Sequence, residues 1–381
     1  MDEIKILNWN IGGAKYLEDK KEEREHTKDK INKGLIRLIE SHTPHVITLQ
    51  EIVQHGEKKQ GNKKILPKDI MDIIDIRKIN KKFEKKYQYC YHPFPLIDTE
   101  KVSSMSKWEK VIEMGGWDKD GIDEETLYFA QGNAFLIRED MAHFPVWHLP
   151  KSENDVRRVC GDNHAIEKVH LDTGLYFGDR NTEPRAALVA HFILVPNKGL
   201  GKKPLDIFVV NTHLTTLIME REGIPEIDKG ASRLRLAQLD IIFHGIVSRY
   251  NTWKQSGYLV RGKNREPKAW ETFDRYQPLW ILAGDFNFTP ESTEYDIIKK
   301  MNFIDLIPIP KKGPGTKAKG VGKEPTLTLD YIFGGPKYIA LDPFLTERQL
   351  EGNLVINTDE KVKASDHYPM IAKIPIILPG D

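Results

Sequence analysis

Residues 280–287 read WILAGDFN and are the most informative stretch of the chain. The apolar run ends at Gly284, and two polar side chains, Asp285 and Asn287, follow at alternating positions. A short continuous apolar run is typical of a β-strand that is buried on both faces. Side chains two residues apart in a strand point the same way, so we expect Asp285 and Asn287 to project together from the strand's end. An unpaired carboxylate is costly in such a place, which predicts a metal ion, a water molecule or a phosphate beside it.

Similar strand-like segments recur along the chain, and helical patterns lie between several of them. The helical patterns are recognised by apolar residues that return to one face every three or four positions. Strands and helices mixed in this way predict an α/β (α+β) domain whose helices pack on the faces of sheets. The predicted strands are 4–9, 45–49, 87–91, 133–138, 186–195, 205–212, 279–284, 329–333 and 370–376, and the predicted helices are 29–40, 231–247 and 291–301.

Long polar segments interrupt this pattern, and we expect them to be insertions in a single domain that covers residues 1–381. Loops of this length in a compact domain are usually functional or partly disordered. Two insertions are basic: residues 58–86, with a predicted helix at 68–84, carry eleven Lys/Arg against four acids, and residues 311–323 carry five lysines and no acid. Each basic stretch is either a solvated surface or a contact for a phosphate backbone. The insertions lie at about 55–86, 98–128, 150–184, 248–278 and 311–326.

Composition excludes several classes of protein. The 57 Lys and Arg residues nearly balance the 56 Asp and Glu residues, and this net charge of +1 argues against a protein that coats nucleic acid. The two cysteines, Cys90 and Cys160, form neither a metal-type pair nor a disulfide framework. No apolar run reaches the roughly 18 residues that a membrane span needs, and the N-terminus does not resemble a signal peptide. We therefore expect a cytoplasmic monomer without a membrane span.

Six short polar motifs and one arginine, Arg185, lie at or near the predicted strand ends. Taken singly, none is decisive, because a carboxylate or a histidine at a strand end is more often solvated or hydrogen-bonded than catalytic. Their order along the chain and their combination carry the information. The motifs are NWNIGG at 8–13, LQE at 49–51, NTHL at 211–214, GDFN at 284–287, LDYI at 329–332 and SDHYP at 365–369.

Together the motifs contain the groups that hydrolysis of a phosphate ester needs. Three carboxylates are hard oxygen ligands, which suit Mg²⁺ or Mn²⁺ better than zinc. Two histidines can change protonation near neutral pH. A fourth carboxylate is available to hold one histidine in a fixed tautomer. These groups are, in the same order, Glu51, Asp285 and Asp366, then His213 and His367, and then Asp330.

The ordered set resembles the endonuclease/exonuclease/phosphatase superfamily, the fold of deoxyribonuclease I and exonuclease III, from Ile4 to about Pro375. GDFN and SDHYP in this order, with LQE and THL before them, carry the resemblance. It implies a four-layer αββα sandwich of two mostly antiparallel sheets with outer helices, and an active site at one edge of the sheets. It also implies roles for the motif residues. Glu51 resembles the principal metal ligand, with Asn10 and Asp366 nearby.

The resemblance assigns the remaining residues to the phosphate and the attacking water. Asp285 resembles the carboxylate that orients or deprotonates the water, and Asn287 its companion on the phosphate. The other implied roles are a histidine that binds the scissile phosphate and takes part in proton transfer (His367, paired with Asp330), a histidine that stabilises the transition state or protonates the leaving oxygen (His213), and an arginine on a phosphate oxygen (Arg185).

Two positions distinguish this chain from particular branches of the family. Deoxyribonuclease-like members place an arginine two residues after the motif glutamate, where this chain has Val53, so one expected phosphate contact is in doubt. The apurinic-endonuclease branch carries asparagine where this chain has His213. The chain therefore resembles the His-bearing branches, which include deoxyribonuclease I, sphingomyelinases, inositol-polyphosphate phosphatases, deadenylases and tyrosyl-DNA phosphodiesterases.

The resemblance implies a Mg²⁺- (or Mn²⁺-) dependent phosphodiesterase, and two classes of substrate stay open. The lysine-rich insertions favour DNA or RNA. The insertion aromatics either stack on bases, which also favours nucleic acid, or pack in the core and loops as aromatic residues ordinarily do. The near-neutral charge favours a small substrate, such as an inositol phosphate, a sphingomyelin-like lipid headgroup or a nucleotide. An inactive binding module is a third class, which the retention of all six motifs disfavours. Endo- or exo-cleavage and one metal or two also stay open. The insertion aromatics are Trp108, Trp117, Trp253, Tyr258 and Trp270.

Overall fold

The computed structural model describes two β-sheets, the helices that cover them and the segments that join them. No helix within this described part is long and apolar enough to cross a membrane. The described residues are 3–13, 21–57, 70–98, 126–141, 143–144, 166–171, 185–194, 205–216, 225–248, 278–307, 315–318, 323, 325–335, 353–354 and 365–375.

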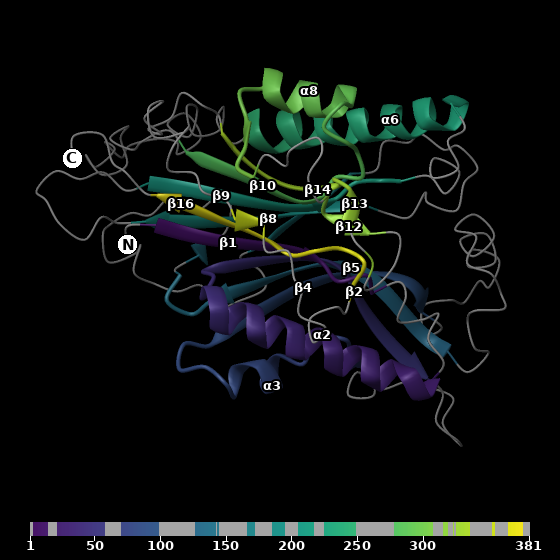
Figure 1. Cartoon of the computed structure of the whole chain (residues 1–381), viewed down its shortest axis with the longest axis vertical. Helices are drawn as coiled ribbons and strands as arrows, with labels where there is room; N and C mark the ends of the chain where they lie inside the picture. Colours follow the sequence, from purple (N-terminus) through teal and green to yellow (C-terminus); the bar gives the residue numbers. More distant parts are fainter. Residues whose placement is uncertain are drawn as a thin grey trace, which may run out of the picture.

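The first sheet has seven strands in the order β15-β16-β1-β2-β5-β4, with β3 paired to β2 (Figure 1). Its central pair, β1 and β2, is parallel, and its other pairs are antiparallel. The strands are β1 (Glu3–Asn10), β2 (Val46–Glu57), β3 (Met71–Asp72), β4 (Tyr87–Asp98), β5 (Thr126–Arg138), β15 (Asn353–Leu354) and β16 (Met370–Pro375).

The second sheet repeats this plan with the order β11-β14-β10-β9-β8-β6 and with β7 paired to β8. Its central pair, β9 and β10, is again parallel, and its other pairs are antiparallel. A two-stranded ribbon, β12 (Lys317–Ala318) with β13 (Pro325–Leu327), lies apart from both sheets. The strands of the second sheet are β6 (His143–Phe144), β7 (Glu167–His170), β8 (Ala186–Leu194), β9 (Leu205–His213), β10 (Leu279–Asp285), β11 (Ile304–Asp305) and β14 (Asp330–Gly335).

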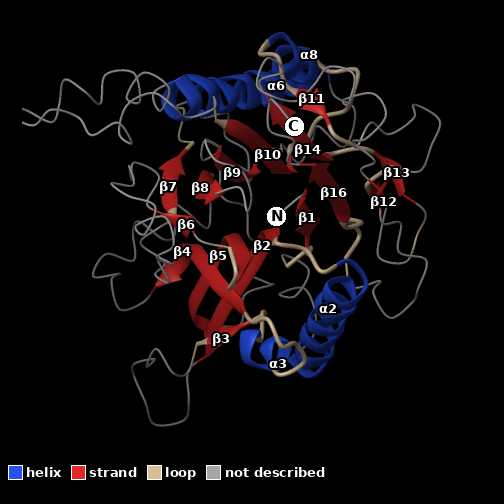
Figure 2. Cartoon of the chain, turned by 90° about the vertical axis from the view of Figure 1, so that its left-hand side faces the viewer, coloured by secondary structure: helices blue, strands red, loops and turns tan. Residues whose placement is uncertain are grey.

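Helices cover the outer face of each sheet, which gives four layers (Figure 2). One outer layer contains α2 and α3, and the other contains α6, the π-helix η4 and α8. The αββα sandwich of two mostly antiparallel sheets is therefore confirmed. The helices are α2 (Lys21–His42), α3 (Ile76–Asn80), α6 (Pro225–Asp240), η4 (Ile241–Ser248) and α8 (Thr293–Lys300).

Strand alternation builds the apolar layers of the sandwich. In β10, Ile281 and Ala283 pack between the two sheets, whereas Trp280 and Leu282 pack under the helices. Complete burial of an isoleucine or leucine side chain contributes about 1.5–3 kcal/mol, so these apolar layers contribute much of the stability. Beyond Ala283 the inner face of β10 becomes polar, because the next residue on that face is Asp285. The space between the sheets is thus an apolar core at one end and a polar site at the other.

The structure contains every predicted strand and the three predicted outer helices. The helix predicted at 68–84 is wrong in extent, because within residues 70–84, which the structure describes, only α3 (Ile76–Asn80) is helical. The side chain of Asp75 caps this helix by accepting from Lys78 N, and the preceding Met71–Asp72 pairs with β2 as a strand. Cys90 is buried between the sheets. Cys160, the insertion aromatics and most of the insertions at 98–128, 150–184 and 248–278 lie outside the described residues.

Candidate active site

The carboxyl ends of β1, β9 and β10 meet at one edge of the sandwich, beside the middle of β2. The parallel pairs β1–β2 and β9–β10 place Asn10, His213 and Asp285 at these strand ends, whereas β2 continues past Glu51 to Glu57. Within the second sheet, Asp285 on β10 is level with His213 on β9 and with Asp330 on β14. Gly284 permits the close approach of β9 and β10, since a Cβ on this residue would stand 1.9 Å from the carbonyl oxygen of Thr212.

Asp285 is the centre of the site, and it is almost completely buried. Its Oδ2 accepts a hydrogen bond from Asn10 Nδ2 at 2.9 Å. The same oxygen lies 3.7 Å from Nε2 of His213 and 3.6 Å from Nε2 of His367. Its Oδ1 accepts the backbone N–H of Asn287 at 3.0 Å. Two hydrogen bonds therefore hold the two oxygens of this carboxylate, and two histidine rings lie close to Oδ2.

The environment of Asp285 alters its acidity. Burial, and after it the neighbouring carboxylate of Asp330, raises the pKa of Asp285. A general base works best when its pKa lies near the working pH, and an ordinary aspartate is too acidic for this. Asp285 is therefore a better proton acceptor than an exposed aspartate, and a raised pKa in such a position is typical of functional sites.

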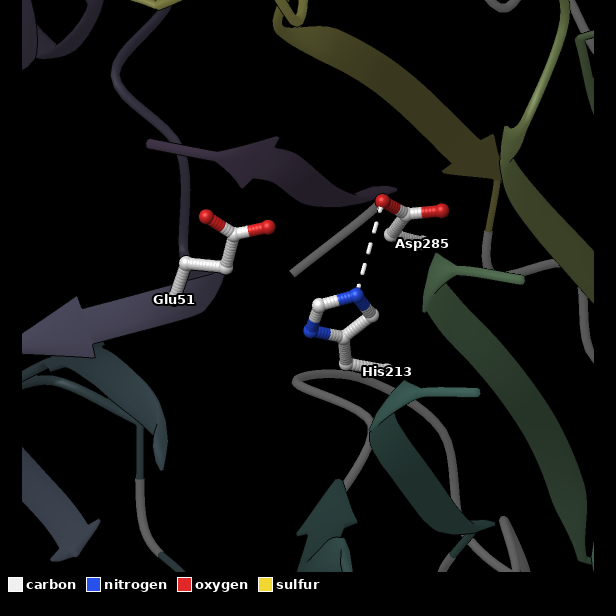
Figure 3. A group of neighbouring side chains, drawn as sticks. All are labelled: Glu51, His213 and Asp285. Carbon is white, nitrogen blue, oxygen red and sulfur yellow. Dashed lines mark ion pairs between the residues drawn. The ribbon is translucent and has the colours of Figure 1, made fainter. Parts of the chain in front are cut away.

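Glu51 enters the site from the first sheet and faces His213 and Asp285 (Figure 3). It lies where the register of β2 against β5 shifts, and its backbone φ is +55°. A non-glycine residue in this left-handed region costs of order 1–3 kcal/mol and persists only where its surroundings enforce it. Gly13 packs against it so closely that a Cβ would stand 1.9 Å from the Glu51 carbonyl oxygen. The amide of Asn10 also donates to Glu51 Oε1 at 3.1 Å and so links Glu51 to Asp285.

A cation holds His213. The Nη1 atom of Arg185 lies 2.8 Å from Nδ1 of His213, and both side chains are buried. A guanidinium only donates hydrogen bonds, so Nδ1 of His213 accepts and the neutral ring carries its proton on Nε2. This Nε2–H lies on the side of Asp285 (Figure 3). Arg185, predicted to contact a phosphate oxygen, is thus at the site and contacts the ring of His213.

An anion holds His367. Its Nδ1 lies 2.9 Å from Oδ2 of Asp330, and both side chains are buried. Burial disfavours the charged ring, but the carboxylates of Asp330 and Asp285 outweigh this effect and raise the pKa of His367. The Nε2 atom is buried without a hydrogen-bond partner among the described residues. The predicted pair of His367 with Asp330 is therefore present, and it leaves Nε2 oriented toward Asp285.

Asn287 and Asp366 lie at the margin of the site. β10 ends at Asp285, so a turn with φ of +53° at Asn287, rather than strand alternation, places the Asn287 side chain. Its Nδ2 donates to the carbonyl oxygen of Leu214 at 2.8 Å, which ties the segments after β9 and β10 together. Asp366 is buried beside Gly12, on which a Cβ would stand 3.4 Å from Asp366 Oδ1. The roles of Asn287 on phosphate and of Asp366 on a metal stay predictions.

Two clusters of side chains in the described part of the chain have ligand atoms that all lie within 4.8 Å of one another. They share Asp285, and they comprise Glu51, His213 and Asp285, and Asp285, Asp330 and His367. Because Arg185 leaves the proton of His213 on Nε2, the available donors of the first cluster are carboxylate oxygens. Oxygen donors fit Mg²⁺ or Mn²⁺. The predicted ligand Asn10 uses its Nδ2 between Glu51 and Asp285, and its Oδ1 accepts from Gly12 N at 2.9 Å.

Sequence reasoning gave no role to three buried amides that join the two sheets beneath the site. Nε2 of Gln50 donates to Oδ1 of Asn8 at 2.9 Å and to Oδ1 of Asn211 at 2.7 Å. Nδ2 of Asn211 donates back to the first sheet, at the carbonyl oxygens of Leu49 and Ala134. Two of them have a signal in the sequence, since Asn8 and Asn211 each stand two residues before a site residue, Asn10 and His213, whereas Gln50 directly precedes Glu51.

Val53, which replaces an arginine found in the deoxyribonuclease-like branch, faces away from the site. It is buried in the apolar layer between the first sheet and its helices. A hydrocarbon side chain there cannot contact phosphate. The doubt that the sequence raised about this contact is therefore supported, and cations at the site come from other positions.

One comparison with known proteins gives a match over nearly the whole chain. Residues 7–367 match the model of the Endonuclease/Exonuclease/phosphatase family. No curated protein sequence matches the chain. Similar solved structures include a protein of this family from Leptotrichia buccalis (15% identity, 98% of this chain, 100% of that chain, TM-score 0.48) and the human nocturnin catalytic domain with bound sulfate (15%, 98%, 95%, TM-score 0.45). At these TM-scores the structural likenesses add nothing to the family match.

Proposed function

Because the chain belongs to the endonuclease/exonuclease/phosphatase family, a family of hydrolytic phosphoesterases, we propose that it is a metal-dependent phosphodiesterase acting on DNA or RNA. The observation that carries this proposal is the environment of Asp285. Its Oδ2 lies 3.7 Å from one buried histidine and 3.6 Å from another, and the two rings have partners of opposite charge. This arrangement provides a base, a neutral hydrogen-bond donor and an acid around one point.

In the proposed reaction Asp285 accepts the proton of the attacking water. The water oxygen forms a bond to phosphorus while the bond from phosphorus to the leaving oxygen breaks. Burial raises the pKa of Asp285 in the metal-free protein, so its carboxylate accepts a proton more readily than that of an exposed aspartate. Asn10 Nδ2 and the backbone N–H of Asn287 hold its two oxygens in place before the substrate binds.

His213 and His367 have different roles in the proposed reaction. His213 donates its Nε2–H to a non-bridging oxygen, on which negative charge increases in the transition state. His367, which Asp330 favours in the charged form, gives its Nε2 proton to the leaving oxygen. One water molecule is consumed, and the products are an alcohol and a phosphate monoester.

The carboxylate oxygens of Glu51 and Asp285 would hold the divalent cation. The amide of Asn10 links these two carboxylates by donating a hydrogen bond to each. When bound, Mg²⁺ or Mn²⁺ supplies positive charge that stabilises the non-bridging oxygens of the phosphate. The left-handed backbone of Glu51 and the hydrogen bond from Asn10 Nδ2 to Glu51 Oε1 place this carboxylate beside Asp285.

Hydrolysis assays test the proposal. The purified protein is incubated with Mg²⁺ or Mn²⁺ and with single- and double-stranded DNA, RNA, inositol phosphates or bis-p-nitrophenyl phosphate. We expect metal-dependent cleavage of nucleic acid and of the synthetic diester, and no cleavage in excess EDTA. The proposal fails if no substrate turns over with metal present.

The balanced charge of the chain favours a second candidate, a phosphohydrolase acting on a small phosphorylated substrate. Salt separates the two candidates, because a protein that contacts several backbone phosphates releases counterions and loses affinity steeply as salt rises. Binding of a labelled oligonucleotide is measured across a salt series. A steep loss supports the nuclease, whereas a flat dependence together with turnover of inositol phosphates supports the small substrate.

A further inference from the structure

One lysine of the basic insertion at 311–323 is fixed beside the active site. Lys317 forms an isolated antiparallel bridge with His367. Two backbone hydrogen bonds flank this bridge, one on each side. They run from Ala318 N to Asp366 O at 2.8 Å and from Tyr368 N to Thr316 O at 2.7 Å.

The hydrogen-bond pattern determines where the Lys317 side chain points. Because the flanking residues make the bonds, Lys317 and His367 form a non-hydrogen-bonded pair, in which the Cα atoms are roughly 4.5 Å apart and the side chains are closest. Directly opposed residues of an antiparallel pair project from the same face. The ring of His367 faces Asp285, with 3.6 Å between Nε2 and Oδ2. The Lys317 side chain therefore leaves the backbone on the face of the site.

The segment that carries Lys317 is also tied to the strand of Asp330. The hydroxyl oxygen of Thr316 accepts the backbone N–H groups of Leu329 and Asp330, both at 3.0 Å. The backbone N–H of Thr316 donates to Leu327 O at 2.7 Å. One threonine thus joins Lys317 to the segment that orients His367. Lys317 is held in place on both sides, unlike a lysine at the tip of a loop.

The ammonium of Lys317 interacts electrostatically with Asp285 and His367. Burial has the largest influence on the pKa of Asp285 and on that of His367, and the Lys317 ammonium is near enough to lower both. Lys317 is only half-buried, so part of its side chain is accessible to solvent. No ion pair of Lys317 occurs among the residues that the structure describes. A cation in this position is available to an anion that enters.

We propose that Lys317 is a substrate-binding residue whose ammonium contacts a non-bridging oxygen of the scissile phosphate from the side of His367. This inference rests on the proposed phosphoesterase function and makes that function more specific. A fixed cation on this side offsets the repulsion between the phosphate and the carboxylates of Asp285 and Asp330. It also supplies a positive charge to a site to which Val53 contributes none.

Three variants test Lys317 in kinetics with bis-p-nitrophenyl phosphate and metal. Loss of one charge-assisted hydrogen bond of about 1.5–3 kcal/mol corresponds to roughly a 10–150-fold loss. We expect K317M to lower kcat/KM by about this factor, mainly through a higher KM, and K317R to retain most of the activity because it keeps the charge. The control K373M removes the same charge from an exposed residue of β16 and should leave kcat/KM unchanged.

Binding of inorganic phosphate gives a second readout that needs no turnover. The Tm of each protein is measured with and without phosphate in the presence of Mn²⁺. We expect phosphate to raise the Tm of the wild-type protein, K317R and K373M, and to raise that of K317M much less. Equal effects in K317M and K373M, in both kinetics and binding, would overturn the proposal for Lys317 and leave the phosphoesterase function standing. A wild-type protein that neither hydrolyses nor binds phosphate overturns both.

Discussion

A histidine lies on each side of Asp285, and the two histidines have partners of opposite charge. On the side of β9, the guanidinium of Arg185 holds His213, and on the side of β14 the carboxylate of Asp330 holds His367. The distances from Nε2 to Asp285 Oδ2 are nearly equal, at 3.7 and 3.6 Å. Position therefore does not distinguish the two rings. Their partners do, because one favours a neutral ring and the other favours a charged ring.

The difference shows how one residue type can serve two chemical roles in one site. A neutral imidazole with its proton on Nε2 is a hydrogen-bond donor and a poor acid. An imidazolium stabilised by a carboxylate is both a cation and a proton donor. Lys317 lies on the charged side, next to His367, so the site is more positive there than beside Glu51. The comparison predicts unequal effects when equivalent changes are made on the two sides.

Removal of the shared carboxylate should have the largest effect, because both sides depend on it. We expect D285N to lower kcat more than about 10³-fold, since the variant loses the proton acceptor and a metal-binding oxygen together. The rate of metal-dependent hydrolysis of bis-p-nitrophenyl phosphate is the measurement. D296N makes the same chemical change at an exposed position in α8 and should keep the wild-type rate. A D285N enzyme within tenfold of wild type would refute the central role of Asp285.

The two histidines should respond unequally to the same substitution. H367Q removes a charged proton donor, and we expect a loss in kcat of about 10²–10⁴-fold. H213Q keeps an N–H donor, so its loss should stay below about 10²-fold. Steady-state kinetics of both variants on one substrate give the ratio of the two losses in kcat. Equal losses, or a larger loss for H213Q, would contradict the division of roles between the two sides.

The amides beneath the site should affect stability and leave the difference between His213 and His367 unchanged. N211A leaves Gln50 Nε2 and two backbone carbonyl oxygens without their present partner, so we expect a loss of about 1–3 kcal/mol in the free energy of unfolding. Denaturant unfolding measures this loss. N80A removes a side chain that bonds only the backbone of Tyr87 and is half-exposed, so it should cost less. A stability of N211A equal to wild type would show that this network is dispensable.

The sequence predicted the positions of the strands well, and the physical reason is local. The predicted end of the second strand at residue 49 was wrong, because β2 continues to Glu57 through the register shift beside Glu51. The apolar run before Asp285 marked β10, and the same type of pattern marked the strands that carry Asn10, Glu51 and His213. The pairing of His367 with Asp330 was predicted by the family resemblance and not by a local pattern, and it is present in the structure. The strand patterns depend on residues within one segment, and the pairing depends on the order of the motifs along the chain.

Contacts between distant segments were not predictable in the same way. The hydrogen bond from Arg185 to His213 depends on the pairing of β8 with β9, and the bridge from Lys317 to His367 depends on how the basic insertion folds back. The helix predicted at 68–84 failed for a related reason. Pairing of Met71–Asp72 with β2 outweighed the local helical pattern. Sequence spacing carries little information about such pairings.

The most direct test of the account is the protonation of the two rings, observed by ¹⁵N NMR of histidine-labelled, metal-free protein across a pH series. H213Q and H367Q assign the signals. The account predicts that neutral His213 carries its proton on Nε2. It predicts that His367 keeps its second proton to a higher pH than free histidine, and that D330N removes this upward pKa shift. A proton on Nδ1 of His213, or an unshifted His367, would contradict the account.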